Sequence, residues 1–395
     1  MEQREVLLTV GLLSFSQALL GQFMIHGVPL FLRDAGQSSD VVALVYIAAI
    51  PYALRFIWGP LIDRYGGPRL GPFGGWILIG QVLSSLLIGG LALSDPSDVV
   101  YPLIAIMFLV MVAIGIQQTA TSGLMIRHLA PASFAHGAAA QAAGSTSAGM
   151  LLGIGVIYLL ADLGWSVVAP TLAVLSLTLL VIIYGRLVLD RGFERQRERA
   201  PWLSHFRIFR AQPARRLLVL STLVSISAAL PYSFKSILLI DARFSVSQSG
   251  VIGIVLGNLA GLITALAVRP LVTRFGGYVV LAGVGILGGL QAIVVAGVDL
   301  AGLFDANATV VLVLASNALI FAAFTANRSI LMGLCEDGRL ATDFATFASM
   351  EAVVILIIAA GGAALLDYTG LEALLLICAA LSAVGVWRVI ALKIV

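Results

Sequence analysis

Charged residues are scarce in this chain of 395 residues. They make up 11% of the sequence, whereas hydrophobic residues make up 60%. A soluble globular domain usually carries about 25% charged residues. A chain this apolar has too little polar surface to cover itself in water and needs lipid as its solvent. The composition therefore predicts a membrane protein, and the long apolar runs described below predict that it is all-α.

Sequence motifs for bound nucleotides, catalytic metals and hydrolytic nucleophiles are also missing. The chain contains no G-x4-G-K-[ST] loop, no H-E-x-x-H and no G-x-S-x-G. Without the first of these it cannot hold ATP as a phosphate-loop pump does. The two cysteines, Cys335 and Cys378, lack the spacing of metal ligands, and we expect no disulfide. We therefore expect no enzyme activity, no cofactor, no metal site and no nucleic-acid partner.

Long hydrophobic runs, in contrast, fill the chain. A membrane-spanning helix needs about 20 predominantly apolar residues. The first run is too long for the core of a signal peptide, about 7–15 residues, so we expect it to be kept as a span. Polar residues, glycines and prolines divide the sequence into twelve predicted spans: 5–32, 39–60, 73–93, 99–125, 137–160, 165–187, 214–240, 248–270, 277–298, 307–331, 344–366 and 371–391.

Basic residues gather in the predicted loops of one side of the membrane. That side holds Arg4, Arg64, Arg69, Arg127, Arg274, Arg339, Lys393 and a central basic stretch between residues 186 and 216. The other side holds essentially Arg33 and Arg243, and its short loops are acidic. Because cytoplasmic loops carry the excess of arginine and lysine, this asymmetry predicts that both termini are cytoplasmic.

An internal repeat relates the two halves of the chain. A shift of 210 residues aligns PLIDRYGG at residues 60–67 with PLVTRFGG at residues 270–277. Both copies fall between the second and third predicted spans of a half, so the halves are parallel repeats of the kind found in six-plus-six transporters. We predict an N-terminal six-helix bundle over 1–187, a cytoplasmic linker over 188–213 and a C-terminal six-helix bundle over 214–395.

The segment GPLIDRYGGPR at residues 59–69 resembles the loop motif G-x3-D-R-x-G-x-x-R of the major facilitator superfamily. It stands between spans 2 and 3, where that family has it. The resemblance implies the major facilitator fold, with twelve transmembrane helices in two pseudo-symmetric six-helix bundles. It also implies that the motif takes part in conformational change through Gly59, Asp63, Arg64, Gly66 and Arg69.

Four shorter segments, FSQAL at 15–19, LRDAG at 32–36, residues 50–64 and ATDFA at 341–345, resemble one branch of this superfamily. The branch contains bacterial inner-membrane importers of siderophores such as pyochelin and rhizobactin, and also the muropeptide permease. The resemblance implies a monomeric, multi-pass inner-membrane protein that couples siderophore uptake to the proton gradient. The alternatives are a permease for muropeptides or other cell-wall fragments and an exporter of drugs or metabolites.

Ionisable side chains inside predicted spans cost a few kcal/mol to insert, so each is a functional candidate. Glu351 lies deep in span 11, and Arg55 lies at a similar depth in span 2. Spans 2 and 11 face each other in the superfamily, so we hypothesise an Arg55–Glu351 pair that breaks when the carboxylate is protonated. The alternatives are a structural carboxylate paired with another basic neighbour and an arginine that extends toward the interface. His26 is a further candidate for proton coupling because histidine titrates near neutral pH.

A second group of polar residues is predicted to bind the transported molecule. His26 follows Gln22 by four residues and shares its helix face, while Lys235 lies beside aromatic residues that could hold an anionic or aromatic ligand. The alternative for the amides is hydrogen bonding between helices. The candidates for substrate binding are Gln22, His26, Gln117, Gln118, Gln141, Lys235, Asn317, Asn327 and Arg328.

Overall fold

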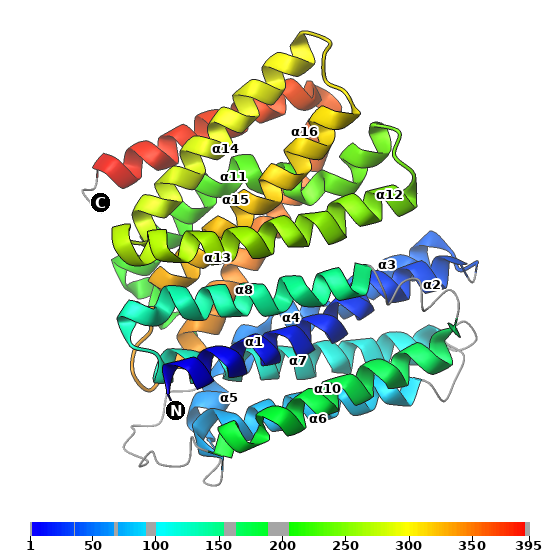
Figure 1. Ribbon diagram of the computed structural model, residues 1–395, viewed down its shortest axis with the longest axis vertical. Coiled ribbons are helices and arrows are strands. Elements are labelled where there is room, and N and C mark those ends of the chain that lie inside the picture. Colours follow the sequence, from blue (N-terminus) through cyan, green and yellow to red (C-terminus); the bar gives the residue numbers. More distant parts are fainter. Residues whose placement is uncertain are drawn as a thin grey trace. The chain divides into compact units, whose positions relative to one another are not determined.

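The computed structural model describes residues 2–34, 36–66, 70–91, 100–153, 163–188 and 205–391. Within these ranges the chain is helical apart from short turns and contains no strand. It forms two compact units (Figure 1). Unit 1 comprises Met1–Ala130, Ser147–Ile208 and Cys335–Ser349, and unit 2 comprises Pro131–Thr146, Phe209–Leu334 and Met350–Val395. The predicted division into bundles over 1–187 and 214–395 stays a prediction.

Unit 1 is built around four long helices. The helix α6 packs against α7 and α10, and α1 packs against the same two helices. Leucine, methionine and aromatic side chains fill the space between them, with the rings of Phe23 and Trp165 5.3 Å apart. The elements are α1 Gln3–Gln22, the π-helical turn η1 Phe23–Gly27, α2 Val28–Asp34, α3 Ser39–Ala48, α4 Ile50–Ala53, the 3₁₀ turn η2 Arg55–Ile57, α5 Gly59–Arg64, α6 Gly71–Gly90, α7 Val100–His128, α10 Trp165–Val188 and the 3₁₀ segment η7 His205–Arg210.

Unit 2 is organised around α15, which packs against α11, α13 and α14. Two glycines of α13 allow the close approach of α15. A Cβ at Gly257 would lie 2.9 Å from the amide oxygen of Asn317, and one at Gly261 would lie 2.4 Å from the ring of Phe321. The elements are α11 Gln212–Asp241, α12 Val246–Gly250, the π-helical segment η8 Val251–Leu256, α13 Gly257–Phe275, α14 Gly277–Leu300 and α15 Ala306–Met332.

Two helices contribute to both units. The 3₁₀ turn η4 Pro131–Ser133 leads into α8 Phe134–Leu151, whose first part belongs to unit 2. The helix α16 Leu340–Ala391 starts in unit 1 and continues in unit 2, and it is interrupted at Gly370, where φ is 79°. That value favours glycine because a Cβ would be strained there. The interruption falls between the two spans that the sequence predicts at 344–366 and 371–391.

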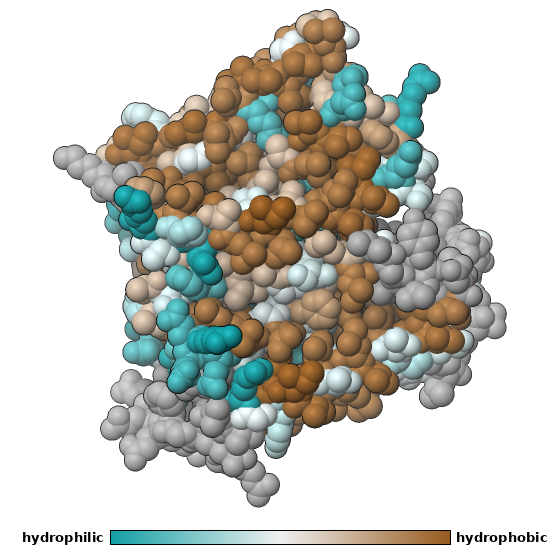
Figure 2. Space-filling view, in the orientation of Figure 1, coloured by the Kyte–Doolittle hydropathy of each residue, from teal (hydrophilic) through white to brown (hydrophobic). Residues whose placement is uncertain are grey.

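The surface of the helices suits a lipid environment. Ten helices of the described residues are long and apolar enough to cross a membrane. Large hydrophobic side chains remain exposed along them, for example Ile286, Leu287, Leu290 and Ile293 on α14. Figure 2 shows hydrophobic residues over most of the visible face. Apolar stripes of this size are costly in water and are normal where lipid covers them.

The predicted spans agree closely with the observed helices, apart from the second and fifth. The second span, 39–60, is divided among α3, α4, η2 and α5. The fifth, 137–160, coincides with α8 as far as residue 151, while residues 154–160 lie outside the described part of the chain. The predicted linker lies largely outside it as well, and α11 already begins at Gln212.

Candidate functional site

The second predicted span changes its helical geometry at Pro51. Proline lacks a backbone N–H and clashes with the preceding turn, so α3 ends at Ala48 and α4 begins anew at Ile50, with Pro51 in its first turn. A 3₁₀ turn follows at Arg55–Ile57. The N–H of Phe56, in that irregular stretch, donates to the hydroxyl of Ser349 on α16 at 3.3 Å. Irregular backbone within a membrane protein needs such partners. Because side chains three residues apart align in a 3₁₀ turn, Tyr52, Arg55 and Trp58 lie along one side.

Arg55 lies in a polar cluster of unit 1. It is 7% exposed, its guanidinium carbon lies 5.1 Å from the centroid of the Tyr52 ring, and its Nη1 donates to Gln118 Oε1 at 3.2 Å. The hydroxyl of Tyr52 donates to the same oxygen. No carboxylate among the described residues of unit 1 pairs with Arg55. The sequence selected Arg55 and Gln118 separately, and the structure brings them together.

A second arginine cluster lies in unit 2. Arg328 on α15 pairs with Glu351 on α16 through an Nη2–Oε2 contact of 2.7 Å, and Asn327 Nδ2 donates to the other carboxylate oxygen at 2.5 Å. The guanidinium carbon of Arg328 lies 5.1 Å from the centroid of the Phe324 ring. The side chains of Arg328 and Glu351 are 8% and 21% exposed. Glu351 is thus a carboxylate paired with a basic neighbour within unit 2, whereas the hypothesised Arg55–Glu351 pair stays a prediction.

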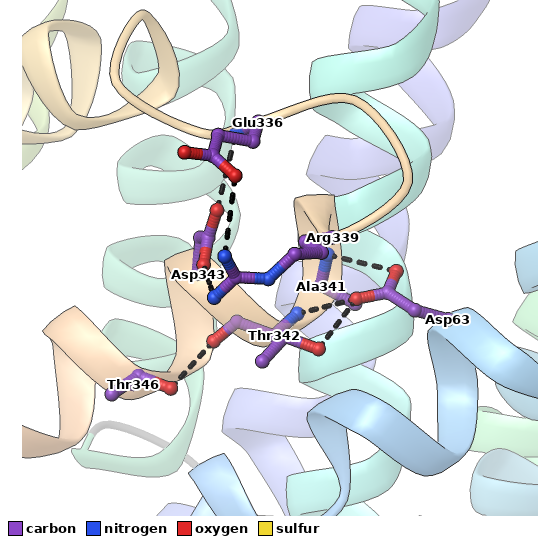
Figure 3. Close-up of polar contacts among 7 residues, drawn as sticks. All are labelled: Asp63, Glu336, Arg339, Ala341, Thr342, Asp343 and Thr346. Atoms are coloured by element: carbon purple, nitrogen blue, oxygen red, sulfur yellow. Dashed lines mark hydrogen bonds and ion pairs between the residues drawn. The ribbon is translucent and has the colours of Figure 1, made fainter. Parts of the chain in front are cut away.

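Asp63 of the loop motif caps the start of α16. Its carboxylate accepts hydrogen bonds from the N–H of Ala341 at 3.2 Å, the N–H of Thr342 at 2.8 Å and the hydroxyl of Thr342 at 2.6 Å (Figure 3). The first turn of a helix leaves N–H groups without partners and carries partial positive charge, so a carboxylate is favourable there. Burial nevertheless dominates and raises the pKa of Asp63 to about 6.

Gly59 fixes the approach of this contact. A Cβ at Gly59 would lie 2.6 Å from Cα of Thr342, which leaves no room for any other residue. Gly59 and Asp63 are four residues apart and therefore share a face of α5, so both motif positions meet the same residue of α16. On the far side of the cluster, Arg339 Nη2 pairs with Asp343 at 2.7 Å, and Asp343 also accepts from the N–H of Glu336 (Figure 3).

The remaining motif residues have different surroundings. A Cβ at Gly66 would lie 2.5 Å from Cα of Pro72, so Gly66 allows the chain to approach the start of α6 closely. Arg64 lies with its guanidinium carbon 5.7 Å from the centroid of the Tyr65 ring. Arg69 lies outside the described residues. Among the described motif residues, Asp63 and Gly59 are the two that contact Thr342.

Gln117, a predicted substrate ligand, belongs to a buried network that holds helices together. Its Nε2 donates to Gln81 Oε1 at 2.6 Å, and Gln81 Nε2 donates to Ser16 Oγ at 2.7 Å and to the carbonyl of Ser176 at 2.8 Å. Ser85 adds a hydrogen bond to Ser176. These residues join α1, α6, α7 and α10, which is the alternative of interhelical hydrogen bonding. Binding of substrate by Gln117 stays a prediction.

The other predicted ligands are spread over both units. The amide of Gln141 is buried, and neither its nitrogen nor its oxygen has a partner among the described residues. Asn317 donates to the carbonyl of Val313 in its own helix at 2.8 Å. Lys235 Nζ lies 4.1 Å from the centroid of the Tyr232 ring. Gln22 ends α1, and His26 is exposed within the π-helical turn η1, a kind of irregularity that is frequent at functional sites.

Sequence reasoning missed several residues that these clusters need. Trp58 and Thr342 were read only as parts of motifs, and Ser349 was not considered. Gln81 could have been found from the repeat, because the shift of 210 residues places it on Gln291, which donates to Ser316 Oγ at 2.7 Å in unit 2. The partners of Arg55 could not have been found this way, because they depend on the break in the second span.

No protein-family model matches the chain. Over 86 residues it is 36% identical to the AmpG 3 protein of Rickettsia typhi, a match that spans 21% of this chain and 20% of that protein. Over 69 residues it is 36% identical to an uncharacterized protein of Haemophilus influenzae, which covers 18% of this chain and 16% of that one. The chain therefore matches about a fifth of the length of these relatives.

Solved structures resemble the chain over its whole length. The crystal structure of the human organic anion transporter MFSD10 (TETRAN) has a TM-score of 0.75 at 15% identity and covers 98% of this chain and 100% of that one. The structure of a bacterial homologue of the iron transporter ferroportin, in an outward-facing state, has a TM-score of 0.69 at 17% identity and covers 99% and 100%. At such identities the similarity shows the fold alone: the chain is an all-α membrane protein with the major facilitator fold.

Proposed function

We propose that this protein is a secondary active transporter that moves a small molecule across the bacterial inner membrane and couples this movement to protons. The observation that carries the proposal is the Arg328–Glu351 pair with Asn327 in unit 2. Ionisable groups inside a membrane bundle are costly and typically mark an ion or substrate pathway. Protonation of Glu351 would remove its charge, break the ion pair and leave Arg328 to find another anion.

The Asp63 contact supports a mechanism of alternating access. It joins the second predicted span to the start of the eleventh through three hydrogen bonds and a glycine contact, with no covalent link. A contact of this kind can break and form again without any change in covalent structure. In the proposed cycle, the capped helix end stabilises one state of the transporter, and the motif residues Gly59 and Asp63 determine how stable that state is. The protein acts as a monomer, with both termini in the cytoplasm.

The favoured substrate is an iron–siderophore complex or another polar, partly aromatic molecule of similar size, which is taken up rather than exported. This choice depends on the resemblance of residues 15–19, 32–36, 50–64 and 341–345 to siderophore importers. A second candidate is a cell-wall fragment such as a muropeptide. It is favoured by the matched 86 residues of the AmpG 3 protein, since the muropeptide permease belongs to the same branch.

Uptake into proteoliposomes with an imposed pH gradient tests the proposal. We expect accumulation of one substrate class when the outside is acidic, and we expect Glu351→Gln to abolish the dependence on the gradient. Asp337→Asn, a change at an exposed loop carboxylate, is the matched control and should transport normally. Accumulation that ignores the pH gradient in the unchanged protein would contradict proton coupling.

Growth of a deletion strain separates the substrate candidates. Under iron limitation, we expect growth to fail when the cognate siderophore is the only one supplied. Normal growth on every siderophore, together with an altered response to β-lactams, would favour the cell-wall fragment instead. The charge-reversed double variant of Arg55 and Glu351 tests their hypothesised pair, because it should restore transport that each single reversal loses.

A further inference from the structure

Hydrogen-bond donors outnumber acceptors around Arg55. A guanidinium offers five N–H donors, and Arg55 uses one of them on Gln118 Oε1. The indole N–H of Trp58 is buried and has no acceptor among the described residues. Because Gln118 Oε1 already accepts from Tyr52 and Arg55, the amide is oriented, and its nitrogen donates to no described residue. Three neighbouring side chains therefore present donors that no described residue of unit 1 accepts.

The positive charge of Arg55 is also without a compensating negative charge among the described residues of unit 1. A buried cation is costly unless an anion or several acceptors compensate it. Within unit 1, Arg55 has one amide oxygen and the face of the Tyr52 ring, and no carboxylate of the described residues. Arg328, in unit 2, shows the usual solution, with Glu351 at 2.7 Å. Buried donors without acceptors are rare in native structures and call for an explanation such as a bound group.

The donors converge because of the local backbone. The 3₁₀ turn at Arg55–Ile57 aligns Arg55 with Trp58, and both border Gly115 on α7. A Cβ at Gly115 would lie 3.7 Å from Cβ of Arg55 and 3.8 Å from Nε1 of Trp58. The absence of a side chain at Gly115 keeps this edge of the cluster open. Gln118 lies three residues further along α7, on the same face.

We propose that Arg55, Trp58 and Gln118 form an anion-binding site that takes the carboxylate of the transported molecule. The planar fork of an arginine matches a carboxylate in a bidentate arrangement, and the indole and amide N–H groups supply further donors. The Tyr52 ring, already beside the guanidinium, favours a carboxylate attached to an aromatic or other flat group. This assignment rests on the proposed transport function, since it gives that transporter a substrate class: organic molecules that carry a carboxylate.

Benzoate is the probe for the test, and the indole signal of Trp58 is the readout. The purified full chain, labelled with ¹⁵N at its five tryptophan indoles, is held in a neutral detergent without phospholipid. Comparison with Trp58→Phe assigns the signal. We expect benzoate to shift the Trp58 signal saturably, benzamide to leave it in place, and Arg55→Gln to weaken the affinity for benzoate by about tenfold or more. Arg388→Gln, where an exposed arginine neighbours Trp387, should bind benzoate normally.

A second variant covers the case in which Arg55→Gln fails to fold. Gln118→Glu places a carboxylate where an amide oxygen already accepts from Arg55, and it should occupy the site and weaken benzoate binding by about tenfold. A Trp58 signal that ignores benzoate, moves equally with benzamide, or responds only to added phosphatidylglycerol overturns the proposal. Binding that Arg55→Gln abolishes supports the site even if proteoliposomes move no substrate, so the transport proposal and this one fail separately.

Discussion

Both units bury an arginine beside an aromatic ring and an amide, Arg55 in unit 1 and Arg328 in unit 2, but only Arg328 pairs with a carboxylate among the described residues of its own unit. In unit 1, Arg55 lies 5.1 Å from the Tyr52 ring and donates to Gln118. In unit 2, Arg328 lies 5.1 Å from the Phe324 ring and is paired with Glu351. The unit 2 cluster is therefore neutral, whereas the described residues of unit 1 supply no carboxylate to Arg55.

The difference indicates two kinds of role. A paired arginine and carboxylate can be switched by a proton, because protonation of the acid changes the charge of the cluster. An arginine without a carboxylate cannot be switched in this way and is suited to accept an anion from outside the chain. In the proposed transporter, unit 2 would sense the proton and unit 1 would hold the substrate carboxylate.

Removal of one member of the unit 2 pair should have the largest effect. Arg328→Gln leaves Glu351 half-buried without its cation, and we expect a loss of about 3 kcal/mol in the free energy of unfolding. Unfolding in mixed detergent micelles measures it. The double variant Arg328→Gln with Glu351→Gln should recover most of the loss, because it leaves no charge behind. If the double variant is as unstable as the single one, the pair contributes packing rather than charge balance.

A carboxylate placed beside Arg55, as Glu351 lies beside Arg328, should stabilise the protein. Gln118→Glu gives Arg55 a carboxylate, and we expect the free energy of unfolding to rise by about 1–2 kcal/mol, since a hydrogen bond between charged groups replaces a neutral acceptor. The same measurement on Gln117→Glu is the control, because that residue faces Gln81 instead of an arginine. It should lose stability. A Gln118→Glu protein less stable than the parent would argue against an unbalanced cation at Arg55.

The carboxylate of Asp63, in unit 1, is held by a helix end instead of an arginine. Burial raises the pKa of Asp63 from 3.8 to about 6, so the described state binds its proton more tightly than an unfolded chain does. Its contribution to stability is therefore fully present below about pH 4 and is lost as the pH rises through about 6. Asp63→Asn should remove this part of the pH dependence.

At pH 7 the Asp63→Asn variant should differ from the parent by about 1 kcal/mol or less, because the lost attraction to the helix end offsets the relieved burial of charge. Unfolding at a series of pH values checks both statements. An unchanged slope between pH 4 and 6 in the variant would assign the titration to another group.

Replacement of the unpaired arginine should have the smallest effect on stability. In Arg55→Gln, the oxygen of Gln118 keeps the Tyr52 hydroxyl, so no acceptor is left without a donor. We expect a change of about 0.5 kcal/mol or less, because removal of an uncompensated charge offsets the lost hydrogen bond. A large loss of stability, close to that of Arg328→Gln, would show that Arg55 has a structural role equal to that of its counterpart.

Much of the fold could be predicted from the sequence because hydrophobic run length reflects the thickness of the membrane directly. The orientation that charge asymmetry predicts stays a prediction. Ten of the twelve predicted spans coincide with observed helices that are long and apolar enough to cross a membrane. The break in the second span was missed, although Pro51 and Pro60 lie within it, because single prolines are tolerated inside membrane helices as often as they interrupt them. Pro170, inside α10, is such a tolerated case.

Sequence reasoning selected individual residues of the candidate site but could not predict which of them contact one another. Burial cost alone selected Arg55, Arg328 and Glu351 as candidates. Depth along a span does not identify a partner, however. Within unit 2, Glu351 contacts Arg328 and Asn327, and the Arg55–Glu351 pair stays a prediction. The partner of Asp63 was also out of reach, since it is a helix end and leaves no mark in composition.

The irregular second span has a mechanical consequence. Between Ala48 and Gly59 the chain forms a single α turn and a 3₁₀ turn, with hydrogen bonds such as Trp58 N–H to the carbonyl of Arg55 closing over three residues. In a continuous α-helix, a tilt of the segment that carries Asp63 would rotate the segment that carries Arg55 by the same angle. The interrupted span can take up part of that rotation where one helical element ends and the next begins. The carboxylate contact at one end can therefore open while the arginine cluster keeps its shape, and amide hydrogen exchange should be faster across this interruption than along the neighbouring α7.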